Sequence, residues 1–189
     1  MVRILVFAIL SQCPSVAFAL ADDLKDMILS QREQNDLRNS VLEDRLNTIV
    51  PTVMRREGID AWVLIAREYN DDPVLNTMLP AHKFTVSRRT VLMFLDHGEG
   101  EGVERLTISR WGVGDFKASW VPEEQPDQWA RIADILREFD PKKIGLNYSE
   151  HFGLADGITH TQKQDFTAAL PGSLHSRIVS AEKLAIGWL

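Results

Sequence analysis

The sequence has very little cysteine, because Cys13 is the only one among its 189 residues. A disulfide framework is therefore excluded, and catalysis by a thiolate is excluded once the N-terminal segment with Cys13 is removed. Positive charge is also scarce, since 21 Lys and Arg stand against 27 Asp and Glu, for a net charge of −6. No cluster of Lys and Arg makes a local exception, so we expect no nucleic-acid partner.

The five histidines lack the spacing of metal ligands. No His-x-x-x-His, His-Glu-x-x-His or Cys/His pattern would aim two ligands at one ion, and no Gly-x-Ser-x-Gly motif would present a serine nucleophile. Glu150, His151 and His160 flank one loop and form the best candidate metal site. A zinc site needs three or four ligands, so histidines of loops and helix ends are the simpler interpretation. We therefore predict neither a catalytic residue nor a metal ligand in this chain.

The N-terminus holds a charge-free run, residues 4–21, directly after Arg3. The apolar block ILVFAIL and the small residues that end the run are typical of a secretory signal cleaved before Leu20 or Asp22. This pattern predicts a secreted or periplasmic protein. A membrane anchor needs about 20 strongly apolar residues, and polar residues interrupt this run, so we expect no stable anchor. Lipidation of Cys13 is a lesser alternative, because a glutamine rather than a small residue precedes it.

A long amphipathic helix is predicted over residues 30–58, where apolar residues recur at intervals of three and four. Ser30 and Glu33 have the spacing of a capping box, and Gly58 is placed to end the helix in a left-handed conformation. Pro51 falls inside the pattern, which predicts a kink or a break near that residue.

Strand and helix patterns alternate through the rest of the chain. The expected strands lie at residues 61–66, 89–95, 104–109, 144–146 and 177–179, and the expected helices at residues 71–79, 126–139 and 161–170. The loop at residues 96–102 is rich in glycine and acids, so it would repel a phosphate and is expected to join two strands of a hairpin. The alternation predicts an α/β fold, a mixed β-sheet flanked by helices in three layers.

A polar loop at residues 67–72 directly follows the first predicted strand. Ligands collect near the carboxyl ends of strands in open α/β sheets, so this loop is the most plausible functional segment by position. The competing interpretation is a solvated connection in which Asp72 caps the next helix.

Five separated segments resemble the N-terminal domain of secreted proteins in the creatinase, prolidase and aminopeptidase P family of metallopeptidases, the M24 family. They are LSQREQ from Leu29, MRREGIDAWV from Met54, AREYNDDPVL from Ala66, NYSEHFGLADG from Asn147 and SRIVSAEKL from Ser176. They occur in the same order, and the resemblance covers about residues 24–189. The resemblance is specific to this domain and not to one substrate.

The resemblance implies an α/β domain placed before a larger pita-bread catalytic domain. In that family two Asp, one His and two Glu of the catalytic domain bind two divalent metal ions, commonly manganese, and none of these ligands maps onto this chain. A homodimer and a peptide substrate of the whole protein are also implied. The N-terminal domain helps to form the dimer and excludes long substrates, and Arg67, Tyr69 and Asn70 occupy the loop expected to do so.

The resulting domain prediction is a signal peptide at residues 1–21, the N-terminal α/β domain at residues 22–180, and at residues 181–189 the start of a linker helix to a missing catalytic domain. The apolar end at Trp188 and Leu189 either folds back onto the core or continues into that domain, and we favour continuation.

The expected function is that of a non-catalytic domain that contributes to dimerisation and to gating of the active site. We expect the chain alone to be inactive. One alternative is a self-standing extracytoplasmic binding or scaffold domain, which exposed Trp188 and Leu189 would favour. Another is a hydrolase that uses Glu150, His151 and His160.

Overall fold

The computed structural model describes residues 28–189, so the predicted signal peptide lies outside the described residues. The chain divides into a unit that ends at Leu37 and a larger unit that begins at Arg38. Within residues 28–189, no helix is both long enough and apolar enough to cross a membrane.

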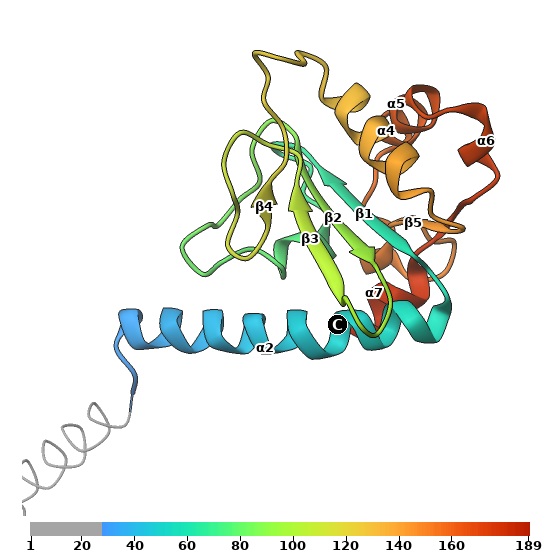
Figure 1. Ribbon diagram of the computed structural model, residues 1–189. Helices are drawn as coiled ribbons and strands as arrows, with labels where there is room; N and C mark the ends of the chain where they lie inside the picture. The colour runs from blue at the N-terminus through green and yellow to red at the C-terminus, as the bar shows by residue number, and fades with distance from the viewer. Residues whose placement is uncertain (1–27) are drawn as a thin grey trace, which may run out of the picture. The chain divides into compact units, whose positions relative to one another are not determined.

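The larger unit is built on a six-stranded sheet with the strand order β4-β3-β2-β1-β5-β6 (Figure 1). The strands are β1 (Ala61–Ala66), β2 (Thr90–Asp96), β3 (Val103–Thr107), β4 (Lys117–Ala118), β5 (Ile144–Leu146) and β6 (Ile178–Ser180). β2 runs antiparallel to both of its neighbours, β1 and β3, and the predicted hairpin joins β2 to β3. β5 runs parallel to both β1 and β6, and β4 runs parallel to β3. The sheet is therefore mixed, as predicted.

β1 lies at the centre of the sheet and is buried along its whole length. Trp62, Leu64 and Ala66 face one hydrophobic core, whereas the residues between them face the other. Successive side chains of a strand point to opposite faces, so a strand covered on both sides is apolar throughout. This burial explains the unbroken apolar run that predicted the strand.

Helices cover both faces of the sheet. They are α2 (Gln31–Glu57), α3 (Pro73–Asn76), α4 (Gln128–Phe139), α5 (His160–Ala169), α6 (Gly172–His175) and α7 (Glu182–Trp188), with a 3-10 turn η1 (Gly153–Ala155). Val50, Val74 and Leu184 carry α2, α3 and α7 into the core that contains Trp62. Leu136 and Phe166 carry α4 and α5 into the other core. In Figure 1, α4 and α5 accordingly lie across the sheet from α2 and α7, which confirms three layers.

The ends of α2 follow the signals in the sequence. The Ser30 N–H donates to Glu33 Oε2 at 2.7 Å and the Glu33 N–H donates to Ser30 Oγ at 3.4 Å, which is the predicted capping box. Gly58 has the predicted left-handed conformation, with φ of 61°. Of the predicted kink or break near Pro51, the break is wrong, because α2 continues through this residue. Val50 and Val53 are buried on either side of this proline, and their packing stabilises the helix despite the lost hydrogen bond.

The C-terminal helix α7 packs onto the core. Trp188 is only 1% exposed, its Nε1 donates to Thr77 Oγ1 at 2.7 Å, and the Arg45 guanidinium lies 4.1 Å from its ring centroid. The expectation that Trp188 is an exposed contact residue is therefore wrong. Leu189 is half exposed. Three short elements, β4, η1 and α6, were not predicted, because two to four residues are too few to show a periodic pattern.

Candidate functional site

The loop that follows β1 forms a tight turn, which we call the Tyr69 turn (residues 67–70). The Asn70 N–H donates to the Arg67 carbonyl at 3.0 Å, and the Arg67 N–H donates back to the Asn70 carbonyl at 3.4 Å. Tyr69 occupies the left-handed region with φ of 63°, and its side chain is fully exposed. A residue with a Cβ pays about 1 kcal/mol for this conformation. All three predicted gating residues are therefore exposed members of one turn.

The turn is anchored on its C-terminal side by Asp72. The carboxylate of Asp72 is fully buried, and its Oδ1 accepts from the Val74 N–H at 2.8 Å and from the Leu75 N–H at 2.9 Å. Pro73 follows as the first residue of α3, where its missing N–H is not needed. The expectation that Asp72 caps a helix is confirmed. The same expectation described the connection as solvated, which is wrong for Asp72.

The other carboxylate oxygen of Asp72 ends a buried polar chain formed by Trp62, Asn147 and Asp72. Trp62 Nε1 donates to Asn147 Oδ1 at 2.8 Å, and Asn147 Nδ2 donates to Asp72 Oδ2 at 2.8 Å. Gly157 packs directly against this carboxylate, because a Cβ at Gly157 would lie 2.2 Å from Asp72 Oδ2. This buried polar chain therefore links the core around β1 to the loop after β1 and the loop after β5.

Parallel strands bring these two loops together. β5 pairs with β1 in parallel, with Leu146 opposite Val63, so both strands leave the sheet at the same edge. Asn147 is the first residue after β5, and Asp72 lies shortly after β1. This is the edge at which ligands bind in open α/β sheets. We call it the carboxyl edge.

Burial raises the pKa of Asp72 above its ordinary value, because an ionised carboxylate loses its hydration inside the protein. Hydrogen bonds from Leu75, Asn147 and Val74 act in the opposite direction and only partly offset the rise. Asp72 is a buried structural acid, without the exposure that a catalytic acid or base requires.

A second polar pair lies beside the turn. Asn76 Nδ2 donates to Asp71 Oδ2 at 3.3 Å. Among the described residues, the buried atoms Asp71 Oδ1 and Asn76 Oδ1 find no hydrogen-bond donor. Both oxygens are inaccessible to solvent, so they are buried acceptors without a partner within residues 28–189. Sequence reasoning did not single out this pair or Asn147.

The alternative metal site is not formed. Glu150, His151 and His160 are exposed, and no group of three or more His, Cys, Asp or Glu side chains within residues 28–189 could hold a metal ion. The hydrolase alternative that depends on these three residues has no support in this part of the chain.

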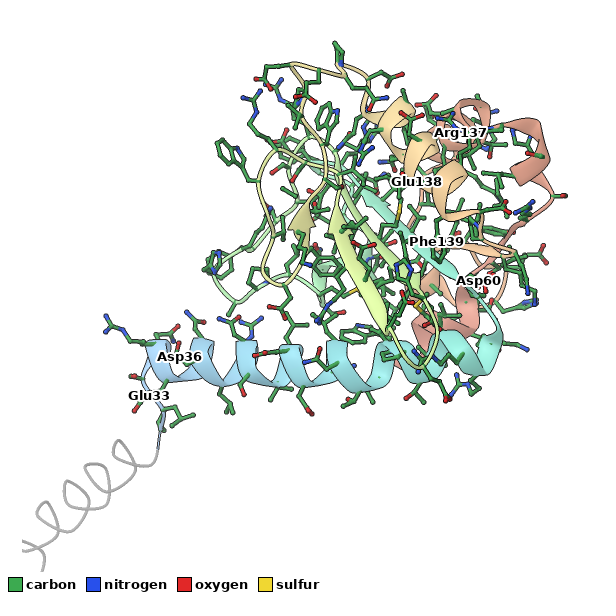
Figure 2. The ribbon with its side chains drawn as sticks, in the orientation of Figure 1. Glu33, Asp36, Asp60, Arg137, Glu138 and Phe139 are labelled. Carbon is green, nitrogen blue, oxygen red and sulfur yellow. The ribbon has the colours of Figure 1, made fainter. Side chains whose placement is uncertain are left out.

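The opposite edge of the sheet carries a groove of about 740 Å³ between the β2–β3 hairpin and α4. Figure 2 labels Glu138 and Phe139 of this region, and Asp60 directly before β1. The groove contains several acids, two of which are paired: Asp96 binds Arg55 at 3.0 Å, and Glu104 Oε2 lies 3.3 Å from a ring nitrogen of His97. It contains none of the predicted site residues.

No protein-family model matches the chain, and no curated protein matches it. Among solved structures, the chain is similar to an Xaa-Pro dipeptidase from Bacillus anthracis, with a TM-score of 0.43 and 12% sequence identity over 70% of this chain. The chain spans about a third (32%) of the length of that dipeptidase. A likeness of this size does not establish the family, so membership in the M24 family stays a prediction based on the five sequence segments.

Proposed function

We propose that this chain is a non-catalytic, secreted or periplasmic N-terminal domain of an Xaa-Pro aminopeptidase-like metallopeptidase of the M24 family. In this proposal a separate catalytic domain holds two divalent ions, manganese by resemblance, and this domain contributes to the homodimer and limits access of peptide substrates. The five sequence segments support the family, and a mixed α/β sheet in three layers agrees with the domain that they imply.

The conformation of Tyr69 is the observation that carries the gating role. Its ring is fully exposed, and its backbone holds a conformation that favours glycine. Neither feature stabilises this domain, and strained residues of this kind cluster at functional sites. Tyrosine is also enriched where proteins contact their partners.

Substrate selectivity of the full-length protein tests the gating role. We expect Tyr69→Ala to raise kcat/KM for a long Xaa-Pro peptide relative to an Xaa-Pro dipeptide about tenfold, because a closed turn discriminates by length. Lys142→Ala is the matched control, since Lys142 is exposed and precedes β5 at the opposite edge. An unchanged ratio of the two kcat/KM values in Tyr69→Ala would refute gating by this turn.

Activity of the chain alone tests the non-catalytic role. We expect the purified chain, incubated with manganese and an Xaa-Pro dipeptide, to release no proline above the buffer rate. Release that depends on the metal and is lost on chelation would show that the chain is itself a hydrolase.

A second candidate is a self-standing binding or scaffold domain, favoured by two exposed aromatic residues. Phe84 is 83% exposed and Trp111 is 75% exposed. The loops that contain them lie side by side, because a Cβ on Gly114, in the loop of Trp111, would lie 3.5 Å from Pro80, in the loop of Phe84. The downstream reading frame separates the candidates: a following domain with spaced Asp, His and Glu supports the metallopeptidase, whereas a stop codon supports the scaffold.

A further inference from the structure

We propose that Asp72 and Asn147 are positioning residues, which hold the Tyr69 turn and the loop after β5 as one rigid unit through hydrogen bonds of fixed direction. The inference rests on the proposed function for what the turn does, whereas the positioning itself is measured without any enzymatic activity. Its basis is the buried polar chain and the backbone contacts at its two ends.

The direction of the hydrogen bonds is set at both ends of the buried polar chain, at Trp62 and at Asp72. The Trp62 indole can only donate, so Asn147 must turn its Oδ1 toward Trp62 and its Nδ2 toward Asp72. At the other end, the Val74 and Leu75 amides can only donate, so residue 72 must offer them an acceptor. The side chain at 147 therefore needs an acceptor facing Trp62 and a donor facing Asp72, and Asn provides both.

Asp72 and Asn147 of the buried polar chain each restrain a loop. On one side, Arg67 pairs with Asn70 directly after β1 and Asp72 is fixed in the cap of α3, so the backbone of Tyr69 is held between two anchors. The left-handed conformation of Tyr69 follows from these restraints, since nothing local favours it for a tyrosine.

On the other side, the Asn147 carbonyl accepts from the Ile158 N–H at 2.9 Å, which closes the loop after β5. The Ser149 N–H donates to Asp156 Oδ1 at 3.2 Å across the same loop. Gly157 of this loop lies against the Asp72 carboxylate, so the two loops touch at the acid itself. Loss of either polar partner is expected to release both loops together.

An exchange of the two side chains tests the proposal. Asp72→Asn keeps the acceptor for the helix amides but turns an amide N–H₂ toward that of Asn147. Asn147→Asp places a second carboxylate against Asp72. The double variant Asp72→Asn/Asn147→Asp restores every hydrogen bond, because a carboxylate at 147 accepts from both Trp62 and the amide at 72. A role limited to side-chain volume would not distinguish the single variants from the double variant.

The readout is the NMR order parameter of the Tyr69 and Asn70 backbone amides in the purified chain. We expect values near 0.85 in the wild type and the double variant, and values below about 0.6 in each single variant. Leu136→Ala is the control for general destabilisation, since Leu136 is buried in the other core, and the turn should stay rigid in it. Rigid single variants, or a double variant as mobile as the single ones, would overturn the proposal.

Two further measurements keep the proposal testable. If the single variants do not fold, Trp62→Phe removes the indole donor and part of the ring volume but leaves residues 72 and 147 unchanged, and we expect an order parameter between those of the wild type and a free loop. Unchanged order in Trp62→Phe would then count against the polar chain. In the full-length protein, a mobile turn with unchanged length selectivity would uphold the positioning role and refute the gating function, so the two failures are distinguishable.

Discussion

The two edges of the central sheet are stabilised in different ways. At the carboxyl edge, Asp72 and Asn147 are buried and the hydrogen bond between them has one possible direction. At the opposite edge, Asp96 pairs with Arg55 in a bidentate contact that is partly open to solvent, with the Arg55 side chain 33% exposed and the Asp96 side chain 10% exposed. Exposed ion pairs contribute about 0 to 1 kcal/mol, whereas a buried group that loses its partner costs about 1 to 3 kcal/mol. The carboxyl edge should therefore tolerate substitution far less than its counterpart.

The largest expected effect is that of Asp72→Ala, which removes a helix cap and leaves three N–H donors without an acceptor. We expect the free energy of unfolding to fall by about 3 kcal/mol, from the lost cap and the buried unsatisfied donors together. Urea denaturation measures the difference. Asp96→Ala is the matched substitution at the other edge, with an expected loss below about 1 kcal/mol. Equal losses in the two variants would contradict the comparison.

The next largest effect is a difference in stability between alanine substitutions at two glycines of the loop after β5. A Cβ at Gly157 would meet the Asp72 carboxylate at 2.2 Å, whereas a Cβ at Gly153 would meet nothing within 4 Å. Because the carboxylate is fixed by three hydrogen bonds, Gly157→Ala should lower the free energy of unfolding by about 2 kcal/mol, as overpacking does. Gly153→Ala should be nearly neutral in the same denaturation experiment. A tolerated Gly157→Ala would show that the carboxylate can move.

Local and distant features of this chain differ in how well they could be predicted. The β1 run, the Ser30 capping box and the Asp72 cap each depend on a few neighbouring residues, and all three were predicted. The contact between Asp72 and Asn147 joins residues 75 positions apart, and Asn147 alone resembles any polar residue at the end of a strand. Only the parallel pairing of β1 with β5 brings it to Asp72.

The prediction for the C-terminus was wrong because its contacts are also distant in sequence. A tryptophan at the end of a sequence has no visible partner, yet Trp188 finds Thr77 and Arg45 far away in the chain. The Tyr69 turn could be located from the sequence by its position alone, because it follows a strand that is easily recognised. Its left-handed Tyr69 could not be foreseen, since tyrosine has no preference for that conformation.

A smaller effect concerns pH, and its sign follows from the raised pKa of Asp72. The folded state binds the proton more tightly than the unfolded chain, so this group's contribution to stability is fully present below the unfolded pKa and is lost as pH rises through the folded pKa. Relative to Asp72→Asn, the wild type should therefore gain stability as the pH falls from the folded pKa of Asp72 to its unfolded pKa. The gain is about 1.4 kcal/mol for every tenfold difference in proton affinity between the folded and unfolded chains. Denaturation of both proteins between neutral and acidic pH measures the difference. A difference that grows as pH rises would contradict the assignment.

The smallest effect is a gain in stability, and it bears on why the carboxyl edge carries Tyr69 at all. Glycine adopts the left-handed conformation without the clash that a Cβ creates, so Tyr69→Gly should raise the free energy of unfolding by about 0.5 to 1 kcal/mol. Tyr69→Ala is the control, because it removes the same exposed ring but keeps the Cβ, and its stability should stay near that of the wild type. If Tyr69→Gly is stabilising and also relaxes length selectivity in the full-length protein, the strain at Tyr69 is kept for contact with a substrate or a neighbouring domain. A destabilised Tyr69→Gly would mean that the ring supports the fold, and the separation between a structural Asp72 and a functional Tyr69 would fail.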